Sequence, residues 1–212
     1  KEETFLLLYP PSKDDKTREI LFIRKSDNHT KVWEGEKLSK KQANELSGID
    51  SIYFIDDFKD ILSSIATKVD TFYINKNEHY RANSPVETRE DRFISWLLKN
   101  YPAHNVAKSN PILQRQRSIK HPDEIDQIKK ACDITRKGFN RVLKFIKPDV
   151  WEYEIEAEFI HEFISSSSKG FAYSPIIASG NDNNVLHYIK NNKQCKSGEL
   201  ILMDVGAEYG NY

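Results

Sequence analysis

A long helical pattern between Ile125 and Ile146 constrains the fold of this chain more than any other feature of the sequence. Apolar or small residues recur along it at alternating spacings of three and four positions, which is typical of a single buried helix face. These residues are Ile125, Ile128, Cys132, Thr135, Phe139, Val142 and Ile146. Acidic residues in the first turn and Pro148 after the last turn predict a helix over residues 123–147. Such a long apolar face needs a sheet to cover it.

The residues that follow this helix predict an α+β domain. A second helical pattern covers residues 152–166, and apolar runs suitable for strands occur at 171–180, 185–189 and 200–210. The polar turns NDNN and KNNKQCKSGE separate these runs. Two helices followed by consecutive strands are typical of an α+β fold. The sheet of this predicted domain has only begun when the sequence reaches Tyr212.

The first half of the chain predicts a different architecture. Short apolar runs alternate with helical patterns, which is typical of an α/β layer with a partly parallel sheet. The predicted strands lie at 4–10, 19–24, 51–55 and 70–75, and the predicted helices at 38–48, 56–68 and 84–100. Residues 101–122 lose periodicity and carry three prolines. We therefore expect an N-terminal α/β domain over residues 1–115 and a second domain over residues 116–212.

Composition limits the class of partner. The 32 basic and 32 acidic side chains cancel, so we expect no nucleic-acid partner and no anionic membrane surface. No apolar stretch approaches the roughly 20 residues needed to span a bilayer. Two cysteines are too few for a disulfide framework, and we expect Cys132 to be a reduced, buried thiol. These features predict a cytoplasmic protein. Its first residue is Lys1 and it opens directly on a strand, so we expect the natural N-terminus and earlier strands to be missing.

Asp204 is the first candidate for chemistry. The apolar residues 200–205 predict a buried strand, in which a carboxylate is costly unless it is paired or bound to a cation. A hard carboxylate oxygen suits Mn, Mg or Zn. The residues alone leave two interpretations open, a metal ligand or a strand-end aspartate that is hydrogen-bonded to a turn.

His187 is the second candidate. It follows SGNDNN, a small polar turn of the kind that lets a substrate approach the backbone closely. A lone histidine between Leu186 and Tyr188 is, however, more often an ordinary core or surface residue. We expect the other five histidines to be solvated in charged loops or on helix faces. They are His29, His79, His104, His121 and His161.

Several motifs carry a resemblance to a known family. SPIIASGNDNNVLHY followed by SGELILMDVGAEYGNY resembles the start of the catalytic domain of the pita-bread metallopeptidases, most closely in aminopeptidase P, the Xaa-Pro aminopeptidases. VWEGEKLS and KHPDEIDQIKKACDIT resemble the same family, and residues 173–212 are the most specific part. The resemblance implies an α/β N-terminal domain of the aminopeptidase P type, followed by the beginning of an α+β pita-bread catalytic domain.

The resemblance also implies roles for four residues. Asp204 matches the first aspartate of a dinuclear metal site, usually manganese, with zinc and cobalt as alternatives. His187 matches a histidine that contacts the substrate and assists proton transfer without binding the metals. Tyr173 matches a tyrosine beside the site that would orient a ligating carboxylate. Trp33 matches a tryptophan that reaches a neighbouring subunit's active site. The resemblance counts both residues among those that bind substrate. For Tyr173 and Trp33, plain packing is the alternative.

The activity that the resemblance implies is release of the N-terminal residue from peptides with proline in the second position, through a metal-bridging water, in a homodimer or homotetramer. A prolidase that takes dipeptides and a non-catalytic pita-bread module that binds peptides or proteins are the alternatives. The family's remaining ligands, an aspartate, a histidine and two glutamates, would lie beyond Tyr212. We therefore expect residues 1–212 alone to be inactive, to bind no metal pair and to be aggregation-prone.

Overall fold

The structure is a computed structural model that describes residues 4–10, 13–76 and 86–212. His79, one of the histidines predicted to be solvated, lies outside the described residues. The chain divides into two compact units, Lys1–Ile112 and Leu113–Tyr212. Within the described part of the chain, every helix is too short or too polar to cross a membrane.

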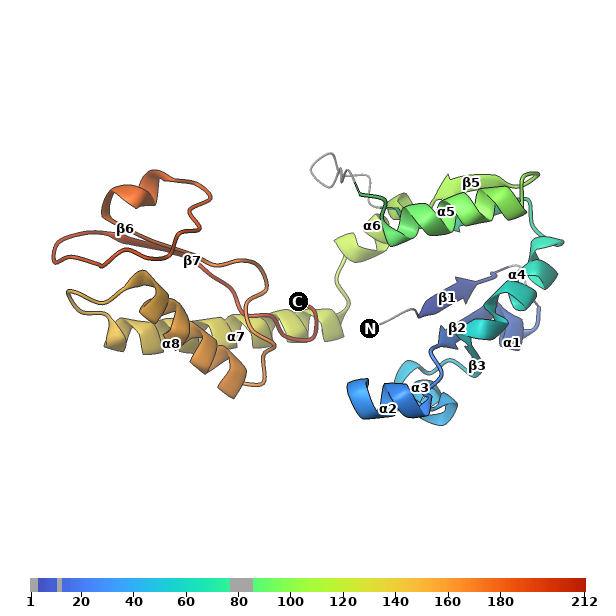
Figure 1. Ribbon diagram of the computed structural model, residues 1–212, viewed down its shortest axis with the longest axis horizontal. Coiled ribbons are helices and arrows are strands. Elements are labelled where there is room, and N and C mark those ends of the chain that lie inside the picture. The colour runs from blue at the N-terminus through green and yellow to red at the C-terminus, as the bar shows by residue number, and fades with distance from the viewer. Residues whose placement is uncertain (1–3, 11–12, 77–85) are drawn as a thin grey trace. The chain divides into compact units, whose positions relative to one another are not determined.

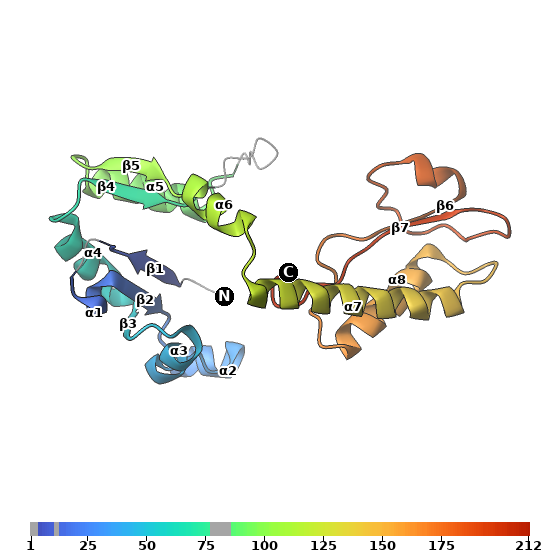
Figure 2. The same ribbon diagram turned by 180° about the vertical axis from the view of Figure 1, so that it is seen from behind.

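The first unit contains two small sheets. In the three-stranded sheet, β1 (Phe5–Leu8) runs antiparallel to β2 (Glu19–Ile23), and β2 runs parallel to β3 (Ser51–Phe54). The second sheet pairs β4 (Thr71–Ile74) with β5 (Asn105–Lys108) in parallel (Figure 2). The prediction of an α/β layer with a partly parallel sheet is confirmed.

Six α-helices accompany these strands in the described part of the first unit, the last of them extending past its boundary. They are α1 (Asp15–Arg18), α2 (Asn28–Glu34), α3 (Lys40–Ser47), α4 (Phe58–Ala66), α5 (Arg89–Asn100) and α6 (Asn110–Ser118). The predicted end signals of α3 are both used, since Ser39 Oγ accepts the Gln42 N–H and Gly48 ends the helix with φ 72°. The stretch 101–122, in which no element was predicted, holds β5, α6 and the start of the next helix. The hydrophobic pattern of β5 is weak in the sequence, because three of its four residues are exposed.

The core of the first unit is aromatic. Phe22 is fully buried, and it packs with Phe58, Leu62 and Leu97, so that β2, α4 and α5 share one core. The Phe5 ring stacks on Phe58 with centroids 4.7 Å apart, which adds β1 to the same cluster.

The second unit packs two helices against a two-stranded sheet (Figure 1). Helix α7 (Pro122–Phe145) and helix α8 (Glu152–Ser165) lie against each other, and α8 contacts β6 (Ile176–Ser179). Strand β6 pairs antiparallel with β7 (Ile201–Asp204), and Ile176 stands opposite Asp204 in the register. Helices followed by strands were predicted here, and this arrangement is confirmed.

The buried face of α7 differs from the predicted one. Its buried residues are Ala131, Ile134, Gly138 and Val142, whereas Cys132 is exposed, which makes the prediction of a buried Cys132 thiol wrong. Gly138 allows the close contact between α7 and α8. A Cβ atom at Gly138 would lie 2.7 Å from Cε1 of Phe163 and 2.9 Å from Cδ1 of Phe159, both on α8. The small residues Ala131 and Gly138 let α8 approach closely on their side of α7. The apolar face that the sequence predicted is therefore turned partly away from the core.

Two strand predictions need correction. Residues 185–189 form a turn and an irregular segment rather than a strand, with Leu186 and Ile189 each 82% exposed. The predicted buried strand at 200–205 is β7, and it is only half-buried. Strand side chains alternate between the two faces, so that Ile201 and Met203 pack on the helices while Leu202 and Asp204 face away.

Candidate functional site

Asp204 lies at the end of β7 with an exposed side chain. The predicted cost of burying its carboxylate therefore does not arise. Its Oδ1 accepts a hydrogen bond of 2.8 Å from the hydroxyl of Tyr173. Within the described residues Oδ2 accepts no hydrogen bond, so one carboxylate oxygen is oriented and the other remains available to a ligand.

Tyr173 reaches Asp204 because two segments run side by side beyond the β6–β7 ladder. Phe171 forms a bridge with Ala207, and the Ala172 N–H donates to the Gly206 carbonyl at 2.8 Å. Gly206 makes room for the tyrosine ring, since a Cβ atom there would lie 3.2 Å from Tyr173 Cε1. Partial burial and the hydrogen bond to Asp204 both raise the pKa of Tyr173, which keeps its hydroxyl protonated as a donor.

His187 lies in the connection between β6 and β7. Its side chain is exposed and makes no hydrogen bond or ion pair within the described ranges. The next residue, Tyr188, is only 5% exposed. The structure brings Tyr173 to Asp204 and leaves the imidazole of His187 free to meet a ligand.

Trp33 lies on α2 in the first unit and is 75% exposed. Its indole lies 6.1 Å from the ring of His29, measured between centroids. His29, His121 and His161 are exposed, as predicted. His104 is not solvated as predicted: its Nε2 lies 2.9 Å from the Ala66 carbonyl and its ring stacks on Phe72 at 4.9 Å.

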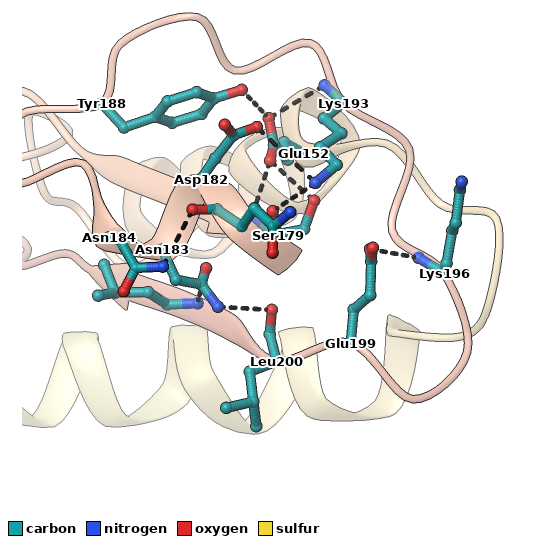
Figure 3. Close-up of polar contacts among 12 residues, drawn as sticks. Glu152, Ser179, Asp182, Asn183, Asn184, Tyr188, Lys193, Lys196, Glu199 and Leu200 are labelled. Carbon is teal, nitrogen blue, oxygen red and sulfur yellow. Dashed lines mark hydrogen bonds and ion pairs between the residues drawn. The ribbon is translucent and has the colours of Figure 1, made fainter.

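Sequence reasoning missed a buried polar cluster around Glu152 (Figure 3). The carboxylate is fully buried, and Oε1 accepts hydrogen bonds from the Ser179 N–H at 2.8 Å and the Ser179 hydroxyl at 2.9 Å. Oε2 accepts from the Tyr188 hydroxyl at 2.7 Å and the Lys193 N–H at 3.0 Å. In the sequence, Glu152 resembles any acid in the first turn of a helix, so no local signal distinguished it.

No group of three or more potential metal-ligating side chains forms within the ranges that the structure describes. A single carboxylate cannot hold a pair of metal ions. Asp204 therefore suits one position of a metal centre, and the described residues do not make up a whole one.

Comparison with known proteins matches both units. The model of the M24 metallopeptidase family matches residues 126–212, and that of the aminopeptidase P N-terminal domain matches residues 1–73. The Xaa-Pro aminopeptidase of Escherichia coli strain K12 is 27% identical over 212 residues, which cover 100% of this chain and 48% of that protein. The Xaa-Pro aminopeptidase of Haemophilus influenzae is 28% identical over 193 residues, which cover 91% of this chain and 43% of that protein.

Solved structures give the same result. The aminopeptidase PepP of Pseudomonas aeruginosa superposes with a TM-score of 0.83 at 25% identity, over 98% of this chain and 47% of that one. A zinc-substituted Escherichia coli aminopeptidase P in complex with product gives a TM-score of 0.77 at 26% identity, over 90% of this chain and 44% of that one. This chain thus spans about half the length of the relatives it matches.

Proposed function

Because this chain belongs to the Xaa-Pro aminopeptidase family, we propose that the whole protein is a metal-dependent aminopeptidase. The chain has an aminopeptidase P N-terminal domain followed by the start of an M24 metallopeptidase domain. The whole protein releases the N-terminal residue from peptides that carry proline in the second position. The single observation that carries the proposal is the hydrogen bond from Tyr173 to Asp204. It orients an exposed carboxylate within the segment that matches the metallopeptidase family.

Asp204 is one ligand of a dinuclear metal site in this proposal. The other ligands would come from residues beyond Tyr212. We propose manganese as the metal, and the zinc-substituted relative keeps zinc as an alternative. When bound, a metal pair would supply Lewis-acid polarisation of a scissile carbonyl and a water of lowered pKa.

The residues of this chain have separate tasks. Asp204 holds a cation through an oxygen that the described residues leave free, while Tyr173 fixes the plane of the carboxylate. His187 contacts the substrate and either stabilises the charge that develops on the carbonyl or passes a proton to the proline nitrogen that leaves. The exposure of its imidazole supports this task.

Trp33 is proposed to contact a neighbouring subunit in a homodimer or homotetramer. Its exposure of 75% supports this assignment, since exposed tryptophans are enriched at interfaces between proteins.

The proposal is tested with the full-length protein loaded with Mn. We expect release of the first residue from an Xaa-Pro-Xaa tripeptide and no release from the matched Xaa-Ala-Xaa tripeptide. An Xaa-Pro dipeptide separates the aminopeptidase from a prolidase, because only a prolidase would prefer it. Asp204→Asn serves as the control and should lower the metal content from about two ions per chain to about one. Absence of cleavage by the metal-loaded protein would contradict the assignment.

A further inference from the structure

The hydrogen-bond acceptor sites of the Glu152 carboxylate are all occupied. An ionised carboxylate offers about four acceptor sites and no donor, and Glu152 receives four hydrogen bonds. Burying a charge is tolerated when hydrogen bonds of this kind replace its water. With all of its lone pairs in use, Glu152 has no capacity left for a metal or a substrate. Its role must therefore concern the segments that donate to it.

All four donors belong to one stretch of chain, residues 179–193, which ends β6 and carries His187. Glu152 is the first residue of α8, where the helix dipole favours a negative charge. Its own N–H donates to the Lys193 carbonyl at 3.0 Å, and Trp151 forms a bridge with Gln194. The start of α8 thus holds the chain on both sides of His187, at Ser179 and at Lys193 (Figure 3).

Tyr188 connects Glu152 to His187, because its hydroxyl donates to Glu152 and it directly follows His187 in the chain. Its ring is buried, whereas the flanking residues Leu186, His187 and Ile189 are exposed. Burial of the ring and the hydrogen bond to Glu152 raise the pKa of Tyr188 to about 12, so its hydroxyl is a constant donor near neutral pH. Because Tyr188 is fixed, the peptide unit before it is fixed as well, and the imidazole of His187 is held on the open side.

We propose that Glu152 is a positioning residue that, through the Tyr188 hydroxyl, holds His187 in place for the reaction. The proposal rests on the proposed function, because the task of His187 is part of it. The proposal gives a role in catalysis to a buried side chain on a different element. Among the described residues, this side chain forms no hydrogen bond with His187 or Asp204.

The test compares Glu152→Gln with Glu154→Gln in the full-length, metal-loaded protein. A carboxamide has a single acceptor oxygen, so Glu152→Gln leaves two buried donors unpaired. We expect deuterium exchange of residues 179–193 to rise by about tenfold or more and kcat to fall by about 100-fold, with KM little changed. Glu154 lies in the same helix turn and, among the described residues, accepts only the Trp151 N–H, at 2.8 Å. Glu154→Gln should therefore leave exchange and kcat unchanged.

A double-mutant cycle with His187→Ala separates positioning from general damage. If Glu152 acts through His187, Glu152→Gln lowers kcat little further once His187 is absent. Fully additive losses, or unchanged exchange in Glu152→Gln, would overturn the proposal. If Glu152→Gln does not fold, Tyr188→Phe removes one donor while keeping the ring, and it should show the same non-additivity.

Failure of the proposed function is recognised separately. In that case the wild-type protein does not cleave Xaa-Pro peptides, while NMR of the His187 imidazole still reports on Glu152. A shift of the His187 resonance in Glu152→Gln, absent in Glu154→Gln, would support positioning without any activity measurement. An unmoved resonance would overturn it.

Discussion

The hydroxyl of Tyr173 donates to Oδ1 of Asp204 at 2.8 Å, although the two residues are 31 positions apart in the chain. The contact joins the segment before β6 to the end of β7, and it fixes one oxygen of a carboxylate whose side chain is otherwise exposed. A ligand oxygen that is held in this way loses less rotational freedom when it binds a cation.

Replacing Tyr173 with Phe removes this donor and keeps the ring. We expect the affinity of the full-length protein for Mn to fall by about 10- to 100-fold, because outer hydrogen bonds of this kind orient metal ligands. Titration against a competing chelator measures the change. Tyr153→Phe is a suitable control, since Tyr153 is exposed on α8 and stacks on Trp151. Equal affinities in wild type and Tyr173→Phe would show that the hydrogen bond does not support metal binding.

Replacing His187 with Ala should separate chemistry from metal binding. The imidazole is exposed and has no partner in the described ranges, and we assign it to substrate rather than to metal. We therefore expect both metals to remain bound while kcat falls by about 10²–10⁴, the range for a lost acid–base group. Metal analysis and steady-state kinetics on the same sample measure the two effects. Loss of metal together with activity would reassign His187 as a ligand.

Tyr188 should make the protein sensitive to alkali. Its pKa is raised from 10.0 to about 12 by burial and by Glu152. Between about pH 10 and 12 the unfolded chain has lost a proton that the folded protein retains, so the free energy of unfolding falls as the pH rises. This stabilising contribution is complete below about pH 10.

Urea unfolding at about pH 9, 10 and 11 tests the alkaline effect. Tyr188→Phe should flatten the fall in the free energy of unfolding across this range. Ser179→Ala removes another donor to Glu152 without removing a phenol, and should keep the wild-type slope. If Tyr188→Phe shows the wild-type slope, ionisation of Tyr188 does not contribute.

Gly138→Ala should destabilise the second unit. Alanine favours a helix over glycine by about 1 kcal/mol, but the new methyl group would lie 2.7 Å from Cε1 of Phe163. Overpacking of a core costs about 1–3 kcal/mol, so we expect a net loss in the free energy of unfolding. Denaturant midpoints measure it, and Asn140→Ala, at an exposed position of α7, is the control. A stabilised Gly138→Ala protein would mean that α8 moves away without cost.

The elements that could be predicted are those with local signals. Ser39 and Gly48 mark the ends of α3 by their own chemistry, and the period of the apolar residues reveals α7. The family resemblance predicted that Tyr173 lies beside a ligating carboxylate but did not say which one. Nothing near Tyr173 or Asp204 in the sequence indicates the other residue, and only the structure pairs them.

The features that could not be predicted depend on distant partners. Spacings of three and four fit two neighbouring stripes of α7, and the choice between them rests on how closely Phe159 and Phe163 approach Gly138. Glu152 resembles an ordinary acid at the start of a helix, since its donors lie 27 to 41 positions away. Long-range hydrogen bonds of this kind leave no local pattern in the sequence.

The pairing of β6 with β7 has a consequence for the order in which the second unit folds. The two strands are joined by residues 180–200 rather than by a tight turn. Closing this long loop costs chain entropy before any hydrogen bond between the strands can form. Helices α7 and α8 are consecutive and can meet earlier. We therefore expect the helix pair to form the folding nucleus and the strand pair to add last. Substitutions in residues 180–200 should then accelerate unfolding and leave the refolding rate nearly unchanged in a chevron plot.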